Sequence, residues 1–197
     1  MDVTRVREIH PCFGAKANRG RIHLPVCPGC NLECRFCDRK INETENRPGV
    51  AGEIIQPADT IGYIERALRF CPEISVVGIA GPGDTLASDN AIKTFELVGK
   101  HFPKLLKCMS TNGLLLRERA EELIRVGIDT LTVTVNAVDP AIQARIINGL
   151  VYHGKRYEGE AAAEILIRNQ LAGIRKAAAA GMVVKVNTVL IKEINFF

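Results

Sequence analysis

Short apolar runs alternate with helix-like segments along the chain from about residue 57 onward. The runs are rich in β-branched residues and are typical of strands, whereas the segments between them repeat apolar residues every three or four positions, as one face of a helix does. Helices are expected to begin near Asp59 and Ser88 and to cover 117–126 and 160–180. Counting an earlier apolar run, five strands are expected, at residues 22–26, 74–79, 105–109, 130–135 and 183–190.

This order of elements restricts the fold. Strands that alternate with helices of ten or more residues predict βαβ units and a parallel sheet. Because crossover connections are right-handed, the expected α/β fold is a curved open sheet or a partial (β/α) barrel. In both arrangements the active site lies at the carboxyl ends of the strands.

Two stretches do not follow this alternation. Residues 1–56 contain five of the seven cysteines and many polar residues, so we expect a cofactor-binding N-terminal segment followed by a long loop. Residues 136–159 are polar and include Asp139-Pro140 and Asn148-Gly149, which favour turns. A second irregular stretch is therefore expected there.

Composition narrows the class of protein. A chain of 197 residues that is 47% hydrophobic is long enough for one domain with a substantial core. The net charge of +4 is mild and the basic residues are scattered, which argues against nucleic-acid binding. The first ten residues are mostly polar and no run of about 18 apolar residues occurs, so neither a signal peptide nor a membrane span is expected. Seven cysteines in such a chain indicate a reducing cytoplasm, where thiols bind metal rather than form disulfides.

Cys30, Cys34 and Cys37 form a C-x3-C-x2-C triplet just after the first expected strand. Three thiolates on one tight loop can hold three corners of a cubane 4Fe–4S cluster, because soft sulfur ligands suit iron–sulfur centres. No fourth ligand stands at a matching spacing, which leaves one iron open to bind a small molecule. The pattern does not exclude structural zinc, a redox pair through Cys27-Pro-Gly-Cys30, or unrelated buried cysteines.

Glycine-rich or polar segments follow the next three strands, where a parallel sheet would gather them. They are Gly78–Asp84, Ser110–Gly113 and Asn136–Asp139. Glycines let the backbone approach a ligand closely, and exposed N–H groups bind a carboxylate or phosphate. Turn chemistry also explains each segment taken alone. In the same way, Phe36 and His23 are each compatible with a place in the core.

Taken together, these blocks resemble the radical SAM superfamily and, within it, the NifB family. The superfamily signature is the cysteine triplet with an aromatic residue, here Phe36, before its last cysteine. The NifB resemblance covers nearly the whole chain and is carried by several blocks in order. These are His10–Phe13, His23, Cys37–Lys40, Glu45–Val50, Ala80–Asp84, Ser110–Gly113, Thr134–Pro140 and Lys185–Ile191.

The resemblance implies a cofactor and a first reaction step. Cys30, Cys34 and Cys37 would hold a 4Fe–4S cluster whose open iron chelates the amino and carboxylate groups of S-adenosylmethionine (SAM). Reductive cleavage of SAM would then yield a 5′-deoxyadenosyl radical. The residues that the resemblance implies for binding SAM are Phe36, Gly81, Gly83, Asp84, Ser110, Thr111, Asn112, Asn136 and Asn187.

The resemblance also implies a substrate. NifB-type enzymes use one SAM to methylate a substrate cluster and a second to abstract hydrogen from that methyl group. The chain would thus be a lyase or methyltransferase-type maturase that inserts a carbide while fusing two 4Fe–4S clusters into the 8Fe–9S nitrogenase cofactor precursor. Cys12 and His23 match ligands of one substrate cluster, and Cys108 matches a ligand of the other. Glu45 matches a glutamate that would handle protons. The implied partners are the cluster-donor and cofactor scaffold or carrier proteins of nitrogenase assembly.

The sequence departs from the family pattern at three places. Glu43 stands where many members have a cysteine, so either Glu43 or Cys27 is expected to complete the first substrate site, and Lys192 replaces a proline. The family's last strand–helix unit and its C-terminal Cys-x-x-Cys do not occur in the sequence. We therefore expect residues 1–22 to form a cluster-binding segment and residues 23–197 to form a partial barrel. The alternatives are another radical SAM enzyme acting on a peptide or small molecule, a non-catalytic iron–sulfur carrier, or a truncated fragment.

Overall fold

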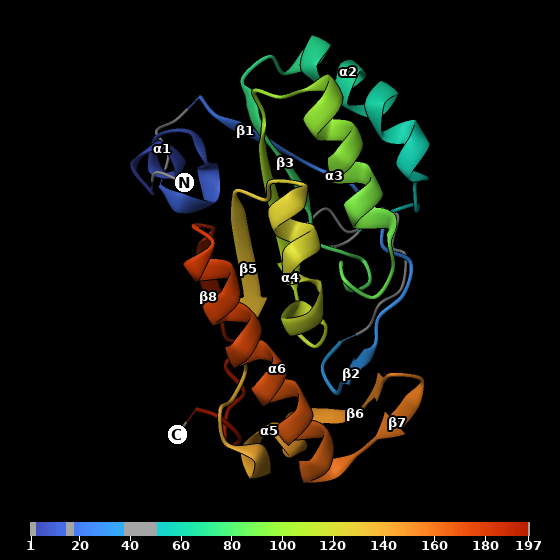
Figure 1. Ribbon diagram of the computed structural model, residues 1–197, viewed down its shortest axis with the longest axis vertical. Helices are drawn as coiled ribbons and strands as arrows, with labels where there is room; N and C mark the ends of the chain where they lie inside the picture. The colour runs from blue at the N-terminus through green and yellow to red at the C-terminus, as the bar shows by residue number, and fades with distance from the viewer. Residues whose placement is uncertain (1–2, 15–17, 38–50, 197) are drawn as a thin grey trace.

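A five-stranded parallel sheet forms the centre of the molecule (Figure 1). The computed structural model describes residues 3–14, 18–37 and 51–196. The strand order is β1-β3-β4-β5-β8, and every neighbouring pair is parallel. The strands are β1 (Gly20–His23), β3 (Ile74–Ile79), β4 (Leu106–Thr111), β5 (Thr130–Thr134) and β8 (Val183–Asn187). This sheet confirms the α/β fold with five parallel strands that the sequence predicts.

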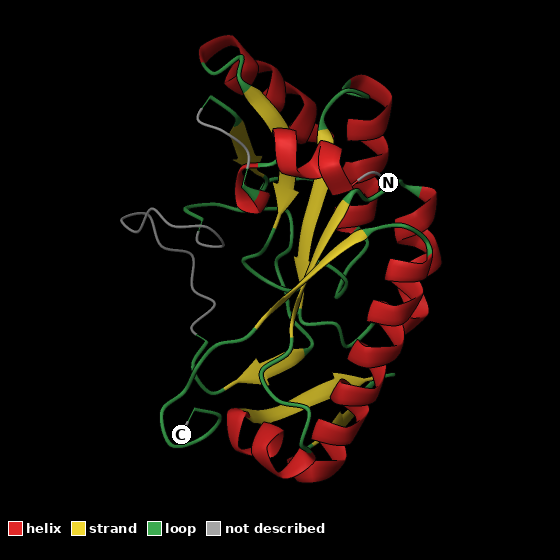
Figure 2. Cartoon of the chain, turned by 90° about the vertical axis from the view of Figure 1, so that its left-hand side faces the viewer, coloured by secondary structure: helices red, strands yellow, loops and turns green. Residues whose placement is uncertain are grey.

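Four helices cover one face of this sheet and lie in front of it in Figure 1. They are α2 (Thr60–Phe70), preceded by the short 3-10 helix η2 (Pro57–Asp59), α3 (Asn90–His101), α4 (Leu116–Arg125) and α6 (Gly159–Ala179). Figure 2 shows the long α6 running along one side of the strands. Gly127 and Gly181 have positive φ just after α4 and α6, which confirms them as helix ends. None of the helices in the described ranges is both long and apolar enough to cross a membrane.

The main core lies between this helical layer and the sheet. Val77, Met109 and Leu131 of three neighbouring strands are fully buried there against Phe95 of α3 and Leu123 of α4. These strand residues are paired across the sheet or lie on the same face, so they form a continuous apolar surface. Burial of this surface against the amphipathic helices is the chief source of stability in such a layered fold.

The opposite face of the sheet is polar. Successive side chains of a strand point to alternate faces, so residues two positions apart share a face. The register aligns His23, Gly78, Cys108 and Thr130 across four neighbouring strands. Further polar residues follow on the same face at spacings of two, namely Arg21, Ser110, Thr132, Thr134, Lys185 and Asn187.

The sheet curves around this polar face. Arg21 of β1 and Lys185 of β8 line the same pocket, although β1 and β8 are the opposite edges of the sheet. Two edge strands can share a pocket only if the sheet bends toward itself, as the wall of a barrel does. The curvature agrees with the partial (β/α) barrel expected from the sequence.

The N-terminal segment closes the amino end of the polar face, where α1 lies beside the upper ends of the strands in Figure 1. This segment comprises α1 (Val3–Ile9) and the 3-10 helix η1 (Pro11–Phe13). Ile9 packs against Val76, Leu106 and Cys108, and Ser75 Oγ donates a hydrogen bond of 2.6 Å to the carbonyl of Ile9. The segment is thereby fixed to the sheet.

A second sheet lies beyond the carboxyl ends of the main strands, at the bottom of Figure 1. In this antiparallel sheet β6 (Ile147–Tyr152) pairs with β2 (Leu32–Cys34) on one side and with β7 (Lys155–Tyr157) on the other. The helix α5 (Pro140–Ile146) leads into β6. The expectation that residues 136–159 are irregular is therefore wrong.

Long-range packing explains this difference. Ile147 and Leu150 of β6 are buried against Leu32 of β2 and Leu166 of α6, which are distant in sequence. The polar pair Asn148-Gly149 interrupts the local apolar pattern, so the strand has little signal of its own. Its partners supply the apolar contacts that its own sequence does not reveal.

The ends of several elements also differ from expectation. β1 ends at His23 rather than at residue 26, and β8 ends at Asn187 rather than at residue 190. Ser88 precedes α3 as predicted, and its Oγ accepts a hydrogen bond of 3.4 Å from the backbone N–H of Asn90.

Gly173 lies where α6 crosses α4, and a side chain there has no room. A Cβ on Gly173 would lie 2.5 Å from Cγ of Leu116 and 2.8 Å from the backbone nitrogen of Arg117. We expect Gly173→Val to lower the free energy of unfolding by about 1–3 kcal/mol, because over-packing pushes the helices apart. This change is measured by unfolding the protein with urea and monitoring the loss of structure by circular dichroism.

Gly62→Ala in α2 is the matched control. The nearest atom to a Cβ at Gly62 is Nη1 of Arg66, at 3.7 Å. This substitution should raise the free energy of unfolding by up to about 1 kcal/mol, because alanine favours the helix. Equal destabilisation by both substitutions would contradict the close contact between α4 and α6.

Candidate active site

The cysteine triplet lines a pocket at the carboxyl ends of β3, β4 and β5. The volume of this cysteine pocket is about 190 Å³. Its wall combines the triplet loop with the segments that follow the parallel strands, as the sequence predicts. The lining residues are Cys30, Leu32, Cys34, Phe36, Cys37, Ala80, Pro82, Gly83, Asp84, Ser110, Thr111, Asn112 and Thr134.

Two backbone hydrogen bonds join the triplet loop to the segment after β3. Gly83 N–H donates to the carbonyl of Cys27 at 2.7 Å, and Asp84 N–H donates to the carbonyl of Gly29 at 2.9 Å. A Cβ on Gly83 would lie only 1.9 Å from the Gly29 oxygen, so glycine is required for this approach. The pairing of β2 with β6 fixes the other side of the loop at Leu32 and Cys34.

Asp84 organises the base of the cysteine pocket. Its carboxylate accepts hydrogen bonds from Thr111 Oγ1 at 2.9 Å, Asn112 N–H at 2.6 Å and Leu86 N–H at 3.0 Å. Burial raises the pKa of Asp84, and these donors partly offset that effect by favouring the carboxylate. Because the chain's own donors occupy this carboxylate, we assign Asp84 to positioning the segment after β4.

Asn112 is the residue that Asp84 positions. Its Nδ2 donates to Asn31 Oδ1 at 2.8 Å and lies 3.6 Å from Cys30 Sγ, while its Oδ1 accepts from Leu114 N–H at 2.8 Å. The amide orientation is therefore fixed from both ends. A fixed N–H donor beside a thiolate favours the charged sulfur that a metal centre requires.

The donor set of the cysteine pocket fits an iron–sulfur cluster. Among the residues that the structure describes, no three His, Cys, Asp or Glu side chains converge closely enough to hold one metal ion. A cubane cluster has a different requirement, because each thiolate binds a separate iron. Three cysteines on one pocket wall provide one thiolate for each of three irons, and the amide of Asn112 supplies a hydrogen-bond donor to sulfur.

A second, larger pocket lies on the polar face of the sheet beside the first. This Arg21 pocket has a volume of about 360 Å³. Arg21 Nη1 donates to Cys12 Sγ at 2.8 Å, which brings the N-terminal segment to the pocket wall. Ala80 and Ser110 line both pockets. The lining residues are Cys12, Arg21, His23, Ala80, Ser110, Thr132, Lys185 and Asn187.

His23 on the wall of this pocket and the buried His10 of the N-terminal segment are both neutral at physiological pH. Burial, reinforced by the nearby Arg21 guanidinium, lowers the pKa of His23 to about 4. Burial, with Arg21 and Lys185 nearby, likewise lowers the pKa of His10 to about 4. His10 Nδ1 accepts a hydrogen bond of 3.1 Å from the backbone N–H of Cys12, so its proton lies on Nε2. A neutral imidazole at His23 is in the form that binds a metal.

The structure does not bring Cys27 or Cys108 to either pocket wall. Cys27 is fully buried in the main core, and burial together with nearby Asp84 raises the pKa of its thiol to about 12. Cys108 is also buried, next to Val76, and burial raises the pKa of its thiol, which Arg21 partly offsets. Cys108 lies on the polar face behind the Arg21 pocket, whereas Cys27 faces the core.

Other residues singled out from the sequence have different surroundings. Asn136 is buried, and its Oδ1 accepts a hydrogen bond of 3.0 Å from Val189 N–H. Gly81 lies beside the cysteine pocket wall but does not line it. Asn187 lines the Arg21 pocket and not the cysteine pocket. Glu43 and Glu45 lie outside the described residues.

Four polar residues that line the two pockets were not among the predicted site residues, namely Arg21, Thr132, Thr134 and Lys185. Each stands on a strand at a spacing of two from another polar residue, as in the run Thr130-Leu-Thr-Val-Thr134. Such alternation inside strands that are otherwise apolar indicates one polar face. That signal was present in the sequence.

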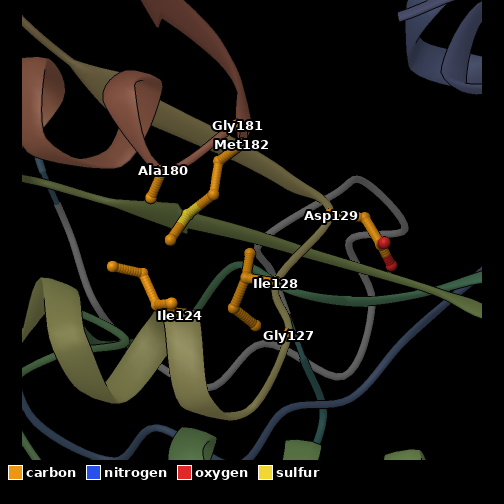
Figure 3. A pocket seen from close by; sticks show the side chains of 7 residues that line it. All are labelled: Ile124, Gly127, Ile128, Asp129, Ala180, Gly181 and Met182. Atoms are coloured by element: carbon orange, nitrogen blue, oxygen red, sulfur yellow. The ribbon is translucent and has the colours of Figure 1, made fainter. Parts of the chain in front are cut away.

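A third pocket lies at the opposite, amino ends of β5 and β8 (Figure 3). Its volume is about 240 Å³. Figure 3 shows the side chains of Ile124, Ile128 and Met182 converging, while the carboxylate of Asp129 points away from them. Asp129 Oδ2 accepts a hydrogen bond of 2.6 Å from Lys107 N–H. This pocket lies at the opposite end of the sheet from both others.

Comparison with known proteins identifies the family. The model of the radical SAM superfamily matches residues 24–196. The chain belongs to the radical SAM superfamily. The superfamily cysteine signature is the triplet that lines the cysteine pocket, so the match agrees with the geometry.

Curated relatives within the superfamily carry the name FeMo cofactor biosynthesis protein NifB. That of Methanocaldococcus jannaschii is 45% identical over 96% of this chain and 65% of the relative. That of Klebsiella pneumoniae is 44% identical over 94% of this chain and 41% of the relative. The chain therefore spans less than two thirds of the length of these relatives.

Solved structures share the fold. A structure of TYW1 with a lysine–pyruvate adduct bound is 19% identical and covers 99% of this chain and 65% of its own, with a TM-score of 0.55. The structure of native anSMEcpe with bound AdoMet is 18% identical and covers 84% of this chain and 42% of its own, with a TM-score of 0.51. These likenesses confirm the radical SAM type of partial barrel.

Gly83→Ala tests the junction between the triplet loop and β3. The new Cβ would lie 1.9 Å from the Gly29 oxygen, so the two loops must separate and their hydrogen bonds must break. We expect iron bound per chain after anaerobic reconstitution to fall to less than about half of the wild-type value, because the triplet loses its support. Gly29→Ala is the matched control, because a Cβ there meets nothing within 4 Å. Full iron binding by Gly83→Ala would contradict the role of this contact.

His10 gives a pH dependence of stability. Its folded pKa of about 4 lies below the unfolded value of about 6.5, so the unfolded chain takes up a proton more readily between these values. The resulting stabilisation is present above about pH 6.5 and is lost as the pH falls toward 4. The Tm of the wild type should therefore be lower at about pH 5 than at about pH 7.5, and His10→Gln should show a smaller drop.

His101→Gln is the control for this pH experiment, because His101 is exposed at the end of α3. Its Tm should drop with pH as much as that of the wild type. The pKa of His23 is lowered as well, so His23 accounts for the part of the drop in Tm that remains in His10→Gln. An unchanged drop in His10→Gln would show that the buried ring does not control the stability of the N-terminal segment.

Proposed function

We propose that this chain binds a 4Fe–4S cluster through Cys30, Cys34 and Cys37 and catalyses radical SAM chemistry of the NifB type. The observation that supports the first part is the placement of all three cysteines on one pocket wall at the carboxyl ends of the parallel strands. Identity of 45% to a NifB protein over 96% of the chain supports the second part.

Held by Cys30, Cys34 and Cys37 and reduced, a 4Fe–4S cluster would supply the electron that cleaves SAM into methionine and a 5′-deoxyadenosyl radical. Ser110 and Thr134 line the same pocket, and their hydroxyls would provide hydrogen bonds for the polar parts of SAM. Phe36 is 46% exposed at this pocket, which leaves its ring face free to cover the adenine. Asp84 and Asn112 hold the triplet loop in place, as their hydrogen bonds indicate.

The Arg21 pocket is the proposed site of a substrate cluster. Cys12 and His23 lie on its wall, and the lowered pKa of His23 keeps the imidazole neutral for binding iron. Cys108 lies behind this pocket on the same face and is proposed as a ligand of the second substrate cluster. We retain Glu45 as the proposed proton carrier, and Cys27 is omitted because its thiol is buried in the core.

The overall reaction proposed for the chain follows the NifB relatives. It is insertion of a carbide during the fusion of two 4Fe–4S clusters into an 8Fe–9S precursor of the nitrogenase cofactor. Proteins that donate clusters and carry the product are the proposed partners. The chain spans 65% of the Methanocaldococcus jannaschii relative. The reaction and the partners are therefore proposals that require experiments on this chain itself.

Single replacement of Cys30, Cys34 or Cys37 by alanine tests the cluster assignment. Each variant should lose SAM cleavage by at least about 100-fold, because an incompletely held cluster cannot deliver its electron to SAM. The assay incubates the anaerobically reconstituted chain with dithionite and SAM and separates the products by chromatography. Cys71→Ala is the matched control, since Cys71 is exposed at the end of α2 and far along the chain from the triplet. Wild-type cleavage by any triplet variant would refute the assignment.

The products also identify the reaction. Formation of both 5′-deoxyadenosine and S-adenosylhomocysteine supports NifB-type chemistry, because the first reports radical formation and the second reports methyl transfer. Only 5′-deoxyadenosine would indicate another radical SAM reaction. Neither product from a chain that retains iron would indicate an iron–sulfur carrier.

A further inference from the structure

The Arg21 pocket has an unbalanced charge. Its eight lining residues include the cations Arg21 and Lys185 and no Asp or Glu. Within the described part of the chain, no carboxylate pairs with either cation. Two uncompensated cations in a half-enclosed cavity create a positive potential that attracts an anion.

Arg21 is held toward the pocket by the sheet. Its side chain crosses Gly78 of the neighbouring strand, where a Cβ would lie 2.5 Å from Arg21 Nε. That glycine therefore makes the space through which the guanidinium reaches Cys12 Sγ. Arg21 Nε is buried and has no hydrogen-bond partner in the protein, so the guanidinium keeps an unused donor.

Lys185 reaches the same cavity from the other edge of the sheet. Its Nζ lies 5.3 Å from the centroid of the Phe13 ring, and Phe13 directly follows Cys12. The two cations thus approach the Cys12 turn from β1 and from β8. Their convergence depends on the curvature of the sheet and not on proximity in sequence.

We propose that Arg21 and Lys185 make this pocket selective for an anionic, sulfide-bearing iron cluster, with Arg21 as the positioning residue for Cys12. The inference rests on the proposed function in taking that cluster as substrate. An iron–sulfur cluster held by thiolates has net negative charge, and its sulfurs accept hydrogen bonds that tune its reduction potential. The fork of Arg21 donates one N–H to Cys12 Sγ and brings a positive charge to the pocket wall, while Lys185 supplies the second charge.

The chemistry of the pocket predicts two measurable effects. Loss of a charged donor next to a metal ligand typically weakens metal binding by about 10–100-fold. Loss of a positive charge also destabilises the more negative, reduced cluster, so the midpoint potential becomes more negative. A residue that only supports the fold would not shift the potential of a cluster that still binds.

The test uses the full chain with Cys30, Cys34 and Cys37 all replaced by alanine, so that iron bound elsewhere can be observed alone. After anaerobic reconstitution, three quantities are measured: iron per chain, the rate of iron loss to a ferrous chelator, and the midpoint potential followed by electron paramagnetic resonance. Arg21→Gln and Lys185→Gln are compared in this background. Lys93→Gln is the matched control, since Lys93 is exposed on α3 and its loss changes the net charge equally.

We expect iron loss to be at least about tenfold faster in Arg21→Gln and Lys185→Gln than in the control, with more negative potentials. Arg21→Lys keeps the positive charge but not the planar guanidinium. Its midpoint potential should therefore change less than that of Arg21→Gln, while its iron loss should still be faster than in the control. Both Gln variants behaving like Lys93→Gln would overturn the inference.

Failure of the proposed function gives a different result. If the triplet-free chain binds no iron, the Arg21 pocket is not a cluster site, and both the substrate assignment and this inference are wrong. If the triplet-free chain binds iron but Arg21→Gln and Lys185→Gln change neither the rate of iron loss nor the midpoint potential, the proposed function stands and the inference is wrong. Circular dichroism of each variant checks that it folds. If Arg21→Gln does not fold, the comparison of Lys185→Gln with Lys93→Gln tests the inference, because Lys185 is only half-buried.

Discussion

The alternation of side chains along five parallel strands is the constraint on which the rest of this structure depends. Val77, Met109 and Leu131 face the helices and supply the buried apolar surface that stabilises the fold. Stability therefore does not require apolar side chains on the other face, where His23 and Thr132 line a pocket. Curvature turns this free face inward, so a sheet with one stabilising side encloses a polar cavity on its other side.

Order in the cysteine pocket depends on close backbone contact rather than on the cysteines themselves. Gly83 approaches Gly29 so closely that no side chain fits, and the paired hydrogen bonds transmit the position of β3 to the triplet loop. The buried carboxylate of Asp84 extends this link to Asn112 beside Cys30. A metal site built in this way is pre-organised, because its ligands are held by groups that need no metal.

Sequence reasoning succeeded where the signal was local. Runs of β-branched residues give the parallel strands, and the spacing of Cys30, Cys34 and Cys37 gives the pocket that they line. It failed where a structure depends on distant partners, as for β6, whose apolar contacts come from Leu32 and α6. Lone charges on strands were also overlooked, because Arg21 and Lys185 converge only through the curvature of the sheet. Asp84 lies at the cysteine pocket as the sequence predicts, and hydrogen bonds from its own chain hold its carboxylate there.

Under the proposed function, chemistry would pass between the two neighbouring pockets. Ala80 and Ser110 line both, so the partition at the ends of β3 and β4 consists of small side chains. A radical generated in the cysteine pocket would have to reach its target without meeting water or protein hydrogens on the way, which requires the reacting atoms to approach closely. Small residues at the partition leave room for that approach, whereas a bulky side chain there would separate the two cavities. Under the same proposal, the charge of the Arg21 pocket would add a second condition, because it would attract an anionic substrate to the side of the partition where the radical is delivered.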